Sequence, residues 1–93
     1  MTAGIAYCTI FGWMKEGFNW DNIKDGFDKY GKELAKHNVE LLFYSTVFGV
    51  TEPWMYVQKF DDIHDWEKGG REGVLDFCPI ERTRTILGWT QNK

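Results

Sequence analysis

The segment VELLFYSTVFGVTEPWMYVQKF, from Val39 to Phe60, decides the fold. We interpret it as two strands, Val39 to Phe48 and Pro53 to Phe60, joined by a short break at residues 49–52. In the first strand, apolar side chains occur at both odd and even positions, so both faces of the strand are apolar. An antiparallel sheet with one face in water alternates apolar and charged residues instead. The sheet that contains this hairpin is therefore expected to be covered on both faces.

The rest of the chain supplies two more strands and two helices. Residues Ile5 to Met14 are rich in β-branched and aromatic side chains, which favours a strand. From Trp20 to His37, apolar residues recur at steps of three and four, which predicts a helix with its charged face in water. A second helix is expected from Asp61 to the glycines at 69 and 70, and a fourth strand from Arg82 to Thr90. The order βαββαβ predicts a ferredoxin-like α+β fold, a four-stranded antiparallel sheet with both helices on one face.

The face of the sheet opposite the helices needs a cover that a chain of 93 residues does not provide. A bare apolar face would be a larger exposed patch than soluble monomers carry. We therefore expect a homodimer in which a second copy covers this face. The residues predicted for the dimer interface are Leu42, Tyr44, Thr46, Phe48, Met55 and Val57.

Composition narrows the class of protein. Ninety-three residues, 43% of them hydrophobic, predict one folded domain over residues 1–93. A net charge of -3 disfavours nucleic acid and membrane surfaces as partners. The start of the chain has no positively charged region, and the apolar run from Ile5 to Met14 is too short to span a bilayer, so we expect a cytoplasmic protein. Cys8 and Cys78 lack the spacing of a metal or redox site and are expected to be buried free thiols.

The segment from Tyr30 to Trp66 resembles the dimeric α/β-barrel superfamily, which includes the antibiotic-biosynthesis-monooxygenase-like and stress-responsive barrel families. A helix ending in KYGKELAKHN is followed by a strand, an FG-containing turn and EPWMYVQKFDDIHDW. The pattern V-x-x-F-D-D-x-x-x-W from Val57 to Trp66 is the most characteristic part. It covers about forty residues, and the order of elements extends the resemblance to the whole chain.

The resemblance implies a homodimer of face-to-face sheets, with a small-molecule pocket between the sheet and the helices of each subunit. Members of these families include cofactor-free oxygenases, haem-degrading enzymes, isomerases and proteins without an assigned reaction. The Asn, Trp and His set of the haem-degrading members has no counterpart at the matching positions, since the first strand holds no Asn. We therefore expect no cofactor, and a small apolar or aromatic compound as the ligand.

A four-residue hairpin loop predicts a register that gathers polar groups on one face. The expected pairs are Leu41 with Phe60, Phe43 with Gln58, Ser45 with Tyr56 and Val47 with Trp54. The pocket predicted on the helix-covered face is lined by Ser45, Tyr56, Gln58, Phe43, Trp54 and Tyr30. A few polar groups in an aromatic hollow suit a small ligand. Alternatively, Tyr56 and Gln58 simply hydrogen-bond within a filled core.

His37 is the candidate catalytic residue, because it continues the buried stripe of the first helix and its near-neutral pKa suits proton transfer. A histidine that only interacts with the last carbonyls of the helix explains the position equally well. His64 is expected to face solvent. Asp61, His64 and Asp65 are close in sequence but suit an exposed first helical turn better than a metal site, so no metal is expected.

Two functions remain open from the sequence. The first is a cofactor-free enzyme, a monooxygenase or isomerase, that acts on an aromatic compound held by Ser45, Tyr56, Gln58 and His37. It predicts a hollow between helix and sheet with a base inside. The second is a non-catalytic dimeric module that binds a metabolite or another protein. It predicts a filled interior, or a pocket with no base.

Overall fold

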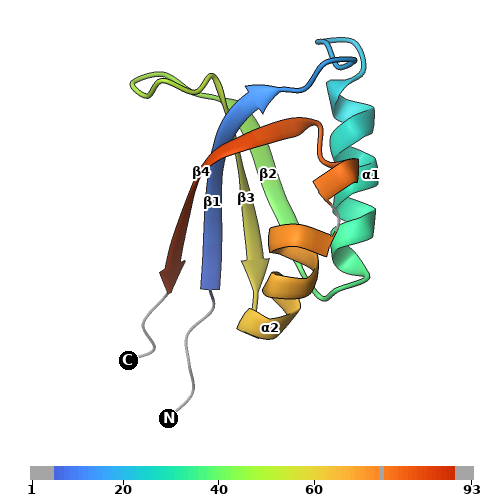
Figure 1. Cartoon of the computed structure of the whole chain (residues 1–93), viewed down its shortest axis with the longest axis vertical. Helices are drawn as coiled ribbons and strands as arrows, with labels where there is room; N and C mark the ends of the chain where they lie inside the picture. Colours follow the sequence, from blue (N-terminus) through green and yellow to red (C-terminus); the bar gives the residue numbers. More distant parts are fainter. Residues whose placement is uncertain (1–5, 74, 90–93) are drawn as a thin grey trace.

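The computed structural model describes residues 6–73 and 75–89, which form an α+β domain (Figure 1). The strands are β1 (Ala6–Met14), β2 (Glu40–Thr46), β3 (Trp54–Phe60) and β4 (Ile80–Trp89). The helical elements are α1 (Ile23–Ala35), a short α2 (Ile63–Asp65), the π-helix η1 (Trp66–Gly73) and a 3-10 turn η2 (Leu75–Phe77). The expected order of strands and helices is confirmed.

The four strands form one antiparallel sheet in the order β2-β3-β1-β4. One core cluster joins the buried residues of α1 and Trp66 to alternate residues of β1 and β3, so both helical segments cover the same face (Figure 1). This arrangement is compatible with a ferredoxin-like fold. The side chains of β1 and β3 that point away from the helices form the second face, which we call the open face.

Helix α1 is held on the sheet by the predicted apolar stripe. Ile23, Phe27, Tyr30 and Leu34 are buried, at steps of four, three and four residues. The charged residues lie on the other side of the helix, where Lys24 pairs with Asp28 at 3.2 Å. Water screens such an exposed pair, so it adds little stability and the apolar stripe is what fixes the helix.

The end of α1 is defined by Asn38, which has a positive φ of 62°. The N–H of Val39 donates to the carbonyl of Leu34, and the N–H of Asn38 to that of Ala35, both at 3.1 Å. These are the two bonds of a Schellman motif, and the apolar contact that accompanies it joins the buried residues Leu34 and Val39. The turn sends the chain directly into β2.

The second helix is not the α-helix that the sequence predicted as far as Gly69. Asp62 caps it as expected, because its Oδ1 accepts from the N–H of His64 at 2.8 Å. After one turn, however, the backbone widens into the π-helix η1. The glycines at 69, 70 and 73 weaken any preference for an α-helix in this segment.

The predicted hairpin register is wrong. The pairs observed are Glu40 with Lys59, Leu41 with Gln58, Phe43 with Val57, Tyr44 with Tyr56, Ser45 with Met55 and Thr46 with Trp54, with a shift between Leu41 and Phe43. The connection spans residues 47–53 and is closed by a bond from the N–H of Val47 to the carbonyl of Pro53 at 3.1 Å. A one-residue slip exchanges the two faces of a strand, so this longer loop reverses most of β2.

The loop between β2 and β3 is tied to the far edge strand. Glu52 accepts from the hydroxyl of Thr83 at 2.6 Å and from Nη2 of Arg84 at 3.2 Å. The Arg84 guanidinium also lies over the ring of Phe11, 4.7 Å from its centroid. Thus the loop packs over one end of the sheet, at β1 and β4.

Candidate functional site

A connected set of polar side chains lies between the helices and the sheet. Tyr30 comes from α1, Tyr56 and Gln58 come from β3, Arg82 comes from β4, and Trp66 begins η1. We call these five residues the buried network. Tyr56 and Gln58 are fully buried on the helix-covered face because they alternate with Met55, Val57 and Lys59 along β3.

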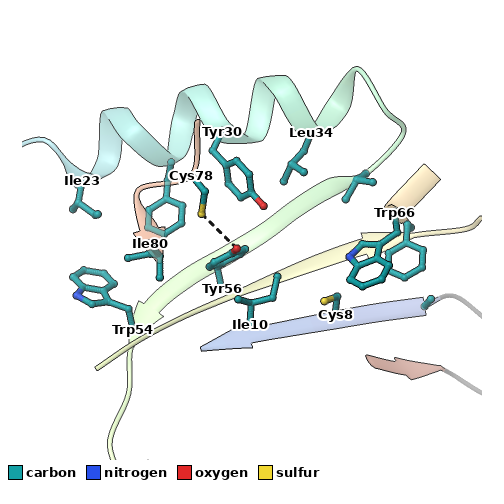
Figure 2. Packing of buried hydrophobic residues seen from close by; sticks show 14 residues of the cluster. Cys8, Ile10, Ile23, Tyr30, Leu34, Trp54, Tyr56, Trp66, Cys78 and Ile80 are labelled. Carbon is teal, nitrogen blue, oxygen red and sulfur yellow. Dashed lines mark hydrogen bonds between the residues drawn. The ribbon is translucent and has the colours of Figure 1, made fainter. Parts of the chain in front are cut away.

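Arg82 joins the two phenols. Its Nε donates to the hydroxyl oxygen of Tyr56 at 2.8 Å, and its Nη2 donates to that of Tyr30 at 2.8 Å. The rings of the two tyrosines meet edge to face, with centroids 5.5 Å apart (Figure 2). Since the guanidinium is planar, two donors aimed at two phenols also fix the orientation of Arg82.

Gln58 extends the network to η1. Its Nε2 donates to the hydroxyl oxygen of Tyr30 at 2.6 Å, and its Oε1 accepts from the indole N–H of Trp66 at 3.0 Å. Every buried side-chain nitrogen and oxygen of the described residues has a hydrogen-bond partner. A ligand that enters this layer therefore has to replace existing hydrogen bonds.

The charges of the network follow from burial. Burial raises the pKa of Tyr30 to about 12, although the Arg82 guanidinium opposes the rise. Burial, and then the neighbouring Tyr30, also raise the pKa of Tyr56. Burial alone would lower the pKa of Arg82. The oxygens of Tyr56 and Tyr30 outweigh the effect of burial, so the pKa of Arg82 lies above its usual value. At neutral pH the network thus contains one guanidinium cation and two protonated phenols.

Both cysteines are buried free thiols, as predicted. The Cys78 thiol donates to the hydroxyl oxygen of Tyr56 at 3.4 Å (Figure 2). Burial raises the pKa of Cys8 to about 11, against the pull of the Arg82 charge. Because a neutral thiol is a poor nucleophile and a poor metal ligand, Cys8 is a structural residue of the core.

Four of the six predicted pocket residues lie on the helix-covered face, namely Tyr30, Trp54, Tyr56 and Gln58, and all four are buried. The other two are corrections. Phe43 pairs with Val57 and Ser45 pairs with Met55, which places both on the open face. The prediction failed for these two residues because it assumed a four-residue hairpin loop.

His37 lies apart from the buried network. It follows the end of α1, where its N–H donates to the carbonyl of Leu34 at 2.9 Å. Its side chain packs against the backbone of η1, so closely that a Cβ built on Gly69 would overlap the imidazole base. None of the described hydrogen bonds of the network comes from His37. The structure therefore places His37 outside the buried network, and its catalytic role stays a prediction.

The predicted interface residues are divided by the same register. Met55 and Val57 lie on the open face, but Tyr44 and Thr46 pair with Tyr56 and Trp54 on the helix-covered face. Tyr44 stacks on Phe27 with ring centroids 4.0 Å apart. Leu42 lies at the register shift, and Phe48 is in the loop, 98% exposed. The apolar side chains that the open face does expose are Trp13, Phe43 and Ile86, at 48%, 51% and 52%.

The described residues form two grooves whose lining differs from the buried network. One, of about 650 Å³, runs between α1 and β2 past Gly31, Asn38 and Leu41. The other, of about 380 Å³, lies between the start of α1 and η2. Neither is lined by Tyr30, Tyr56 or Arg82. The buried apolar residues of the helix-covered layer form one cluster between α1 and the sheet (Figure 2).

Arg82 is the residue of the buried network that sequence reasoning missed. It is the first residue of the fourth strand predicted from the sequence, which was given no part in the pocket. The pairing of β1 with β4 shifts between Phe11 and Gly12, so Arg82 pairs with Gly12, which shares the helix-covered face of β1 with the buried Ile10. A charged residue two positions after the buried Ile80 was the available signal, since residues i and i+2 of a strand share a face.

No group of three or more potential metal-ligating side chains occurs among the described residues. Among the helices of residues 6–73 and 75–89, none has the length and apolar character needed to cross a bilayer. No protein-family model matches this chain, and no curated protein matches it. The geometry of the buried network is therefore the basis for assigning a function.

Proposed function

We propose that the protein binds a small aromatic compound bearing an oxygen atom, in the layer that the buried network occupies. The observation that carries this proposal is the convergence of Tyr30, Tyr56 and Arg82 from three different elements onto one point. A guanidinium and two protonated phenols all donate to oxygen. A carbonyl, phenol or phenolate oxygen of the ligand at this point would accept a hydrogen bond from Arg82 in place of one of the two tyrosine hydroxyls.

The walls around this point favour a flat ligand. Phe27 meets the ring of Tyr56 edge to face, with centroids 5.8 Å apart, and Tyr30 does so at 5.5 Å. Aromatic pairs of this geometry are worth about 0.5 to 1.5 kcal/mol beyond the area they bury, and a ligand ring can take over such contacts. An apolar wall with a few convergent donors is the usual make-up of a small-molecule site.

A cofactor-free monooxygenase or isomerase is the second candidate, in keeping with the resemblance to the dimeric α/β-barrel superfamily. Arg82 and the two phenols would stabilise negative charge that develops on a substrate oxygen. Such a reaction also requires a base. Tyr30 and Tyr56 stay protonated because burial raises their pKa values, and His37 packs against Gly69 instead. Binding without turnover is therefore the first proposal.

We also propose that a second copy of the chain covers the open face, as in a dimeric α/β barrel. Trp13 and Phe43 are each about half exposed there, which leaves roughly 75 to 125 Å² of each side chain in water. A stable interface buries about 800 Å² on each partner. With Ile86, these aromatic side chains are the large apolar groups that the open face offers to such an interface.

A thermal-shift titration tests the binding proposal, with 1-naphthol as the probe and naphthalene as its oxygen-free control. Specific binding to the native state raises Tm with ligand concentration. We expect 1-naphthol to raise Tm more than naphthalene does, and Tyr56→Phe and Arg82→Met to weaken its binding about tenfold or more, since a hydrogen bond to a charged group is worth about 1.5 to 3 kcal/mol.

Ser45→Ala is the matched control, because Ser45 lies on the open face and should leave the titration unchanged. An equal response to both probes, or equal losses in Ser45→Ala and Tyr56→Phe, would overturn the assignment of the site.

A further inference from the structure

We propose that β2 pairs edge to edge with β2 of a second copy of the chain, so that the two sheets join into one. Strand β2 lies at one edge of the sheet, and β3 is its partner strand among residues 6–73 and 75–89. The outer main chain of such a strand is a template for another strand. This contact differs from the cover of the open face, because it uses main-chain groups at the edge. It also does not depend on ligand binding.

The edge at β2 lacks the side chains that usually keep edge strands from pairing. From Leu41 to Thr46 its sequence is LLFYST, without a charged residue or a proline. The side chains of Leu42 and Phe43 are 38% and 51% exposed. The other edge strand, β4, has three charged residues among its first five. Because charged side chains and proline protect an edge strand, β2 is the edge better suited to accept another strand.

The main-chain groups that point outward from β2 follow from its pairing with β3. The N–H of Val47 donates to the carbonyl of Pro53 at 3.1 Å, so this pair is hydrogen-bonded. Bonded and non-bonded pairs alternate along an antiparallel ladder, and this ladder is regular beyond the register shift. The N–H and C=O groups of Ser45 therefore point toward β3, and those of Tyr44 and Thr46 point away from it.

One register of β2 against a second β2 suits these groups best. Residues whose main chains point outward have to lie opposite one another. With a twofold axis at Ser45, Tyr44 lies opposite Thr46 of the second copy and Thr46 opposite its Tyr44, which gives four main-chain hydrogen bonds. A register centred on Tyr44 would include the irregular pairing at Leu42, and one centred on Thr46 would include the loop residue Phe48.

Side chains and charges agree with this register. Phe43 lies opposite Val47 of the second copy, and such apolar cross-strand pairs stabilise a sheet. Ser45 lies opposite its own symmetry mate at the axis. Glu40 is the charged residue of β2, and its two copies lie at opposite ends of the paired segment, roughly 30 Å apart. The pairing of the strands therefore brings no two glutamates of β2 together.

A second copy suits this edge better than a free peptide does. Strand β2 is already extended in each copy, whereas a free peptide loses backbone entropy at each residue that it orders. Twofold symmetric pairs are also the commonest assemblies of soluble proteins. The paired segment, residues 43–47, is short, and it buries less than the about 800 Å² on each partner that a stable interface needs. We therefore expect the contact to form at hundreds of micromolar protein.

A disulfide across the axis tests the register. In a non-hydrogen-bonded antiparallel pair the Cα atoms are about 4.5 Å apart, which a disulfide can span. With oxidised glutathione as the oxidant, we expect Ser45→Cys at several hundred micromolar to form a disulfide-linked dimer on a non-reducing gel. The natural cysteines are buried and should not react.

Thr46→Cys is the matched control for this disulfide. Its two copies would be diagonal neighbours in the proposed register, beyond the reach of a disulfide. We expect its yield of linked dimer to be at least about tenfold lower than that of Ser45→Cys. Equal yields in the two variants, or no linked dimer in either, would overturn the edge pairing.

Thr46→Pro tests the main-chain bonds. It removes an N–H that points outward and spares the bonds to β3, and proline is tolerated at such edge positions. Because two of the four bonds between copies are lost, self-association measured by sedimentation equilibrium should weaken about tenfold or more. Thr46→Ala keeps the N–H and should associate like the natural chain. Equal association of the two variants would contradict the proposal, and the cysteine variants decide it even if Thr46→Pro does not fold.

Ile86→Glu separates this contact from the proposed cover of the open face. Ile86 is 52% exposed on β4, at the edge opposite β2, so a charge there should split a dimer that is held by the open face. Added to Ser45→Cys, we expect Ile86→Glu to leave the yield of linked dimer unchanged and Thr46→Pro to abolish it. The reverse pattern would assign the disulfide to the open face and overturn the edge pairing.

Discussion

Arg82 on β4 donates from Nη2 to the hydroxyl oxygen of Tyr30 on α1 at 2.8 Å, across 52 residues of sequence. This bond connects the edge of the sheet to the helix that covers it. Because the guanidinium also donates to Tyr56, the last strand, the third strand and the first helix meet at one charged group. The same donors that organise the layer are those that we propose for binding an oxygen atom of a ligand.

Removing the hydroxyl of Tyr56 should destabilise the fold. Tyr56→Phe leaves Nε of Arg82 and the Cys78 thiol without their acceptor in a buried place. We expect a loss of about 1 to 3 kcal/mol in the free energy of unfolding, measured by urea denaturation. Tyr7→Phe, on the open face, serves as control and should cost less than about 0.5 kcal/mol. Equal losses in the two variants would show that the network contributes no stability.

Gly12 should not tolerate a side chain. It pairs with Arg82 beside the register shift of β1 and β4, and an added Cβ would overlap the carbonyl oxygen of Glu81. Gly12→Ala is therefore expected to cost about 1 to 3 kcal/mol and to displace Arg82. Gly88→Ala is the control in the partner strand, since nothing lies within 4 Å of its added Cβ. Denaturation midpoints of the two variants measure the difference, and a neutral Gly12→Ala would contradict this packing.

A charge on the open face should separate the proposed dimer. Phe43→Glu places a carboxylate on the open face at the edge strand β2, opposite Val57. We expect sedimentation velocity at micromolar concentration to show a dimer for the natural chain and a monomer for this variant. Lys32→Glu, on the solvent side of α1, should remain dimeric. A monomeric natural chain would rule out the covered open face.

Alkaline pH should destabilise the fold, because the buried Cys8 thiol and Tyr30 phenol lose their protons. The pKa of Cys8 rises from 9.0 to about 11 and that of Tyr30 from 10.0 to about 12 on folding, mainly through burial. Both groups therefore bind protons more tightly in the folded state, so their stabilising effect is complete below pH 9 and is lost as the pH rises toward 11 and 12. Cys8→Ala should lose stability less steeply between pH 9 and 11 than the natural chain, whereas Thr9→Ala should keep its slope.

The order of elements could be predicted because it depends on local periodicity. Each pattern lies within one continuous segment of the sequence. The helical stripe consists of Phe27, Tyr30 and Leu34, and the strand alternation of Trp54, Tyr56 and Gln58. All six residues are buried as expected. Asp62 likewise caps a helix through a bond to a residue two positions away.

Features that depend on the connections could not be predicted. The face of Phe43 depends on the length of the loop after Thr46, and that loop is closed by the bond from Val47 to Pro53. The face of Arg82 depends on a register shift opposite Gly12, which only the pairing of two distant strands reveals. Segment η1 packs at Gly69 against His37, a residue that lies outside its own segment. In each case the deciding contact lies outside the segment whose pattern was interpreted.

The most direct test of the proposed function is a crystal structure of the protein with 1-naphthol bound. The buried network predicts that the ligand oxygen lies within about 3.2 Å of the Arg82 guanidinium and of at least one of the hydroxyls of Tyr30 and Tyr56. A naphthol found in the groove between α1 and β2, with the bonds from Arg82 to both tyrosines intact, would contradict the account.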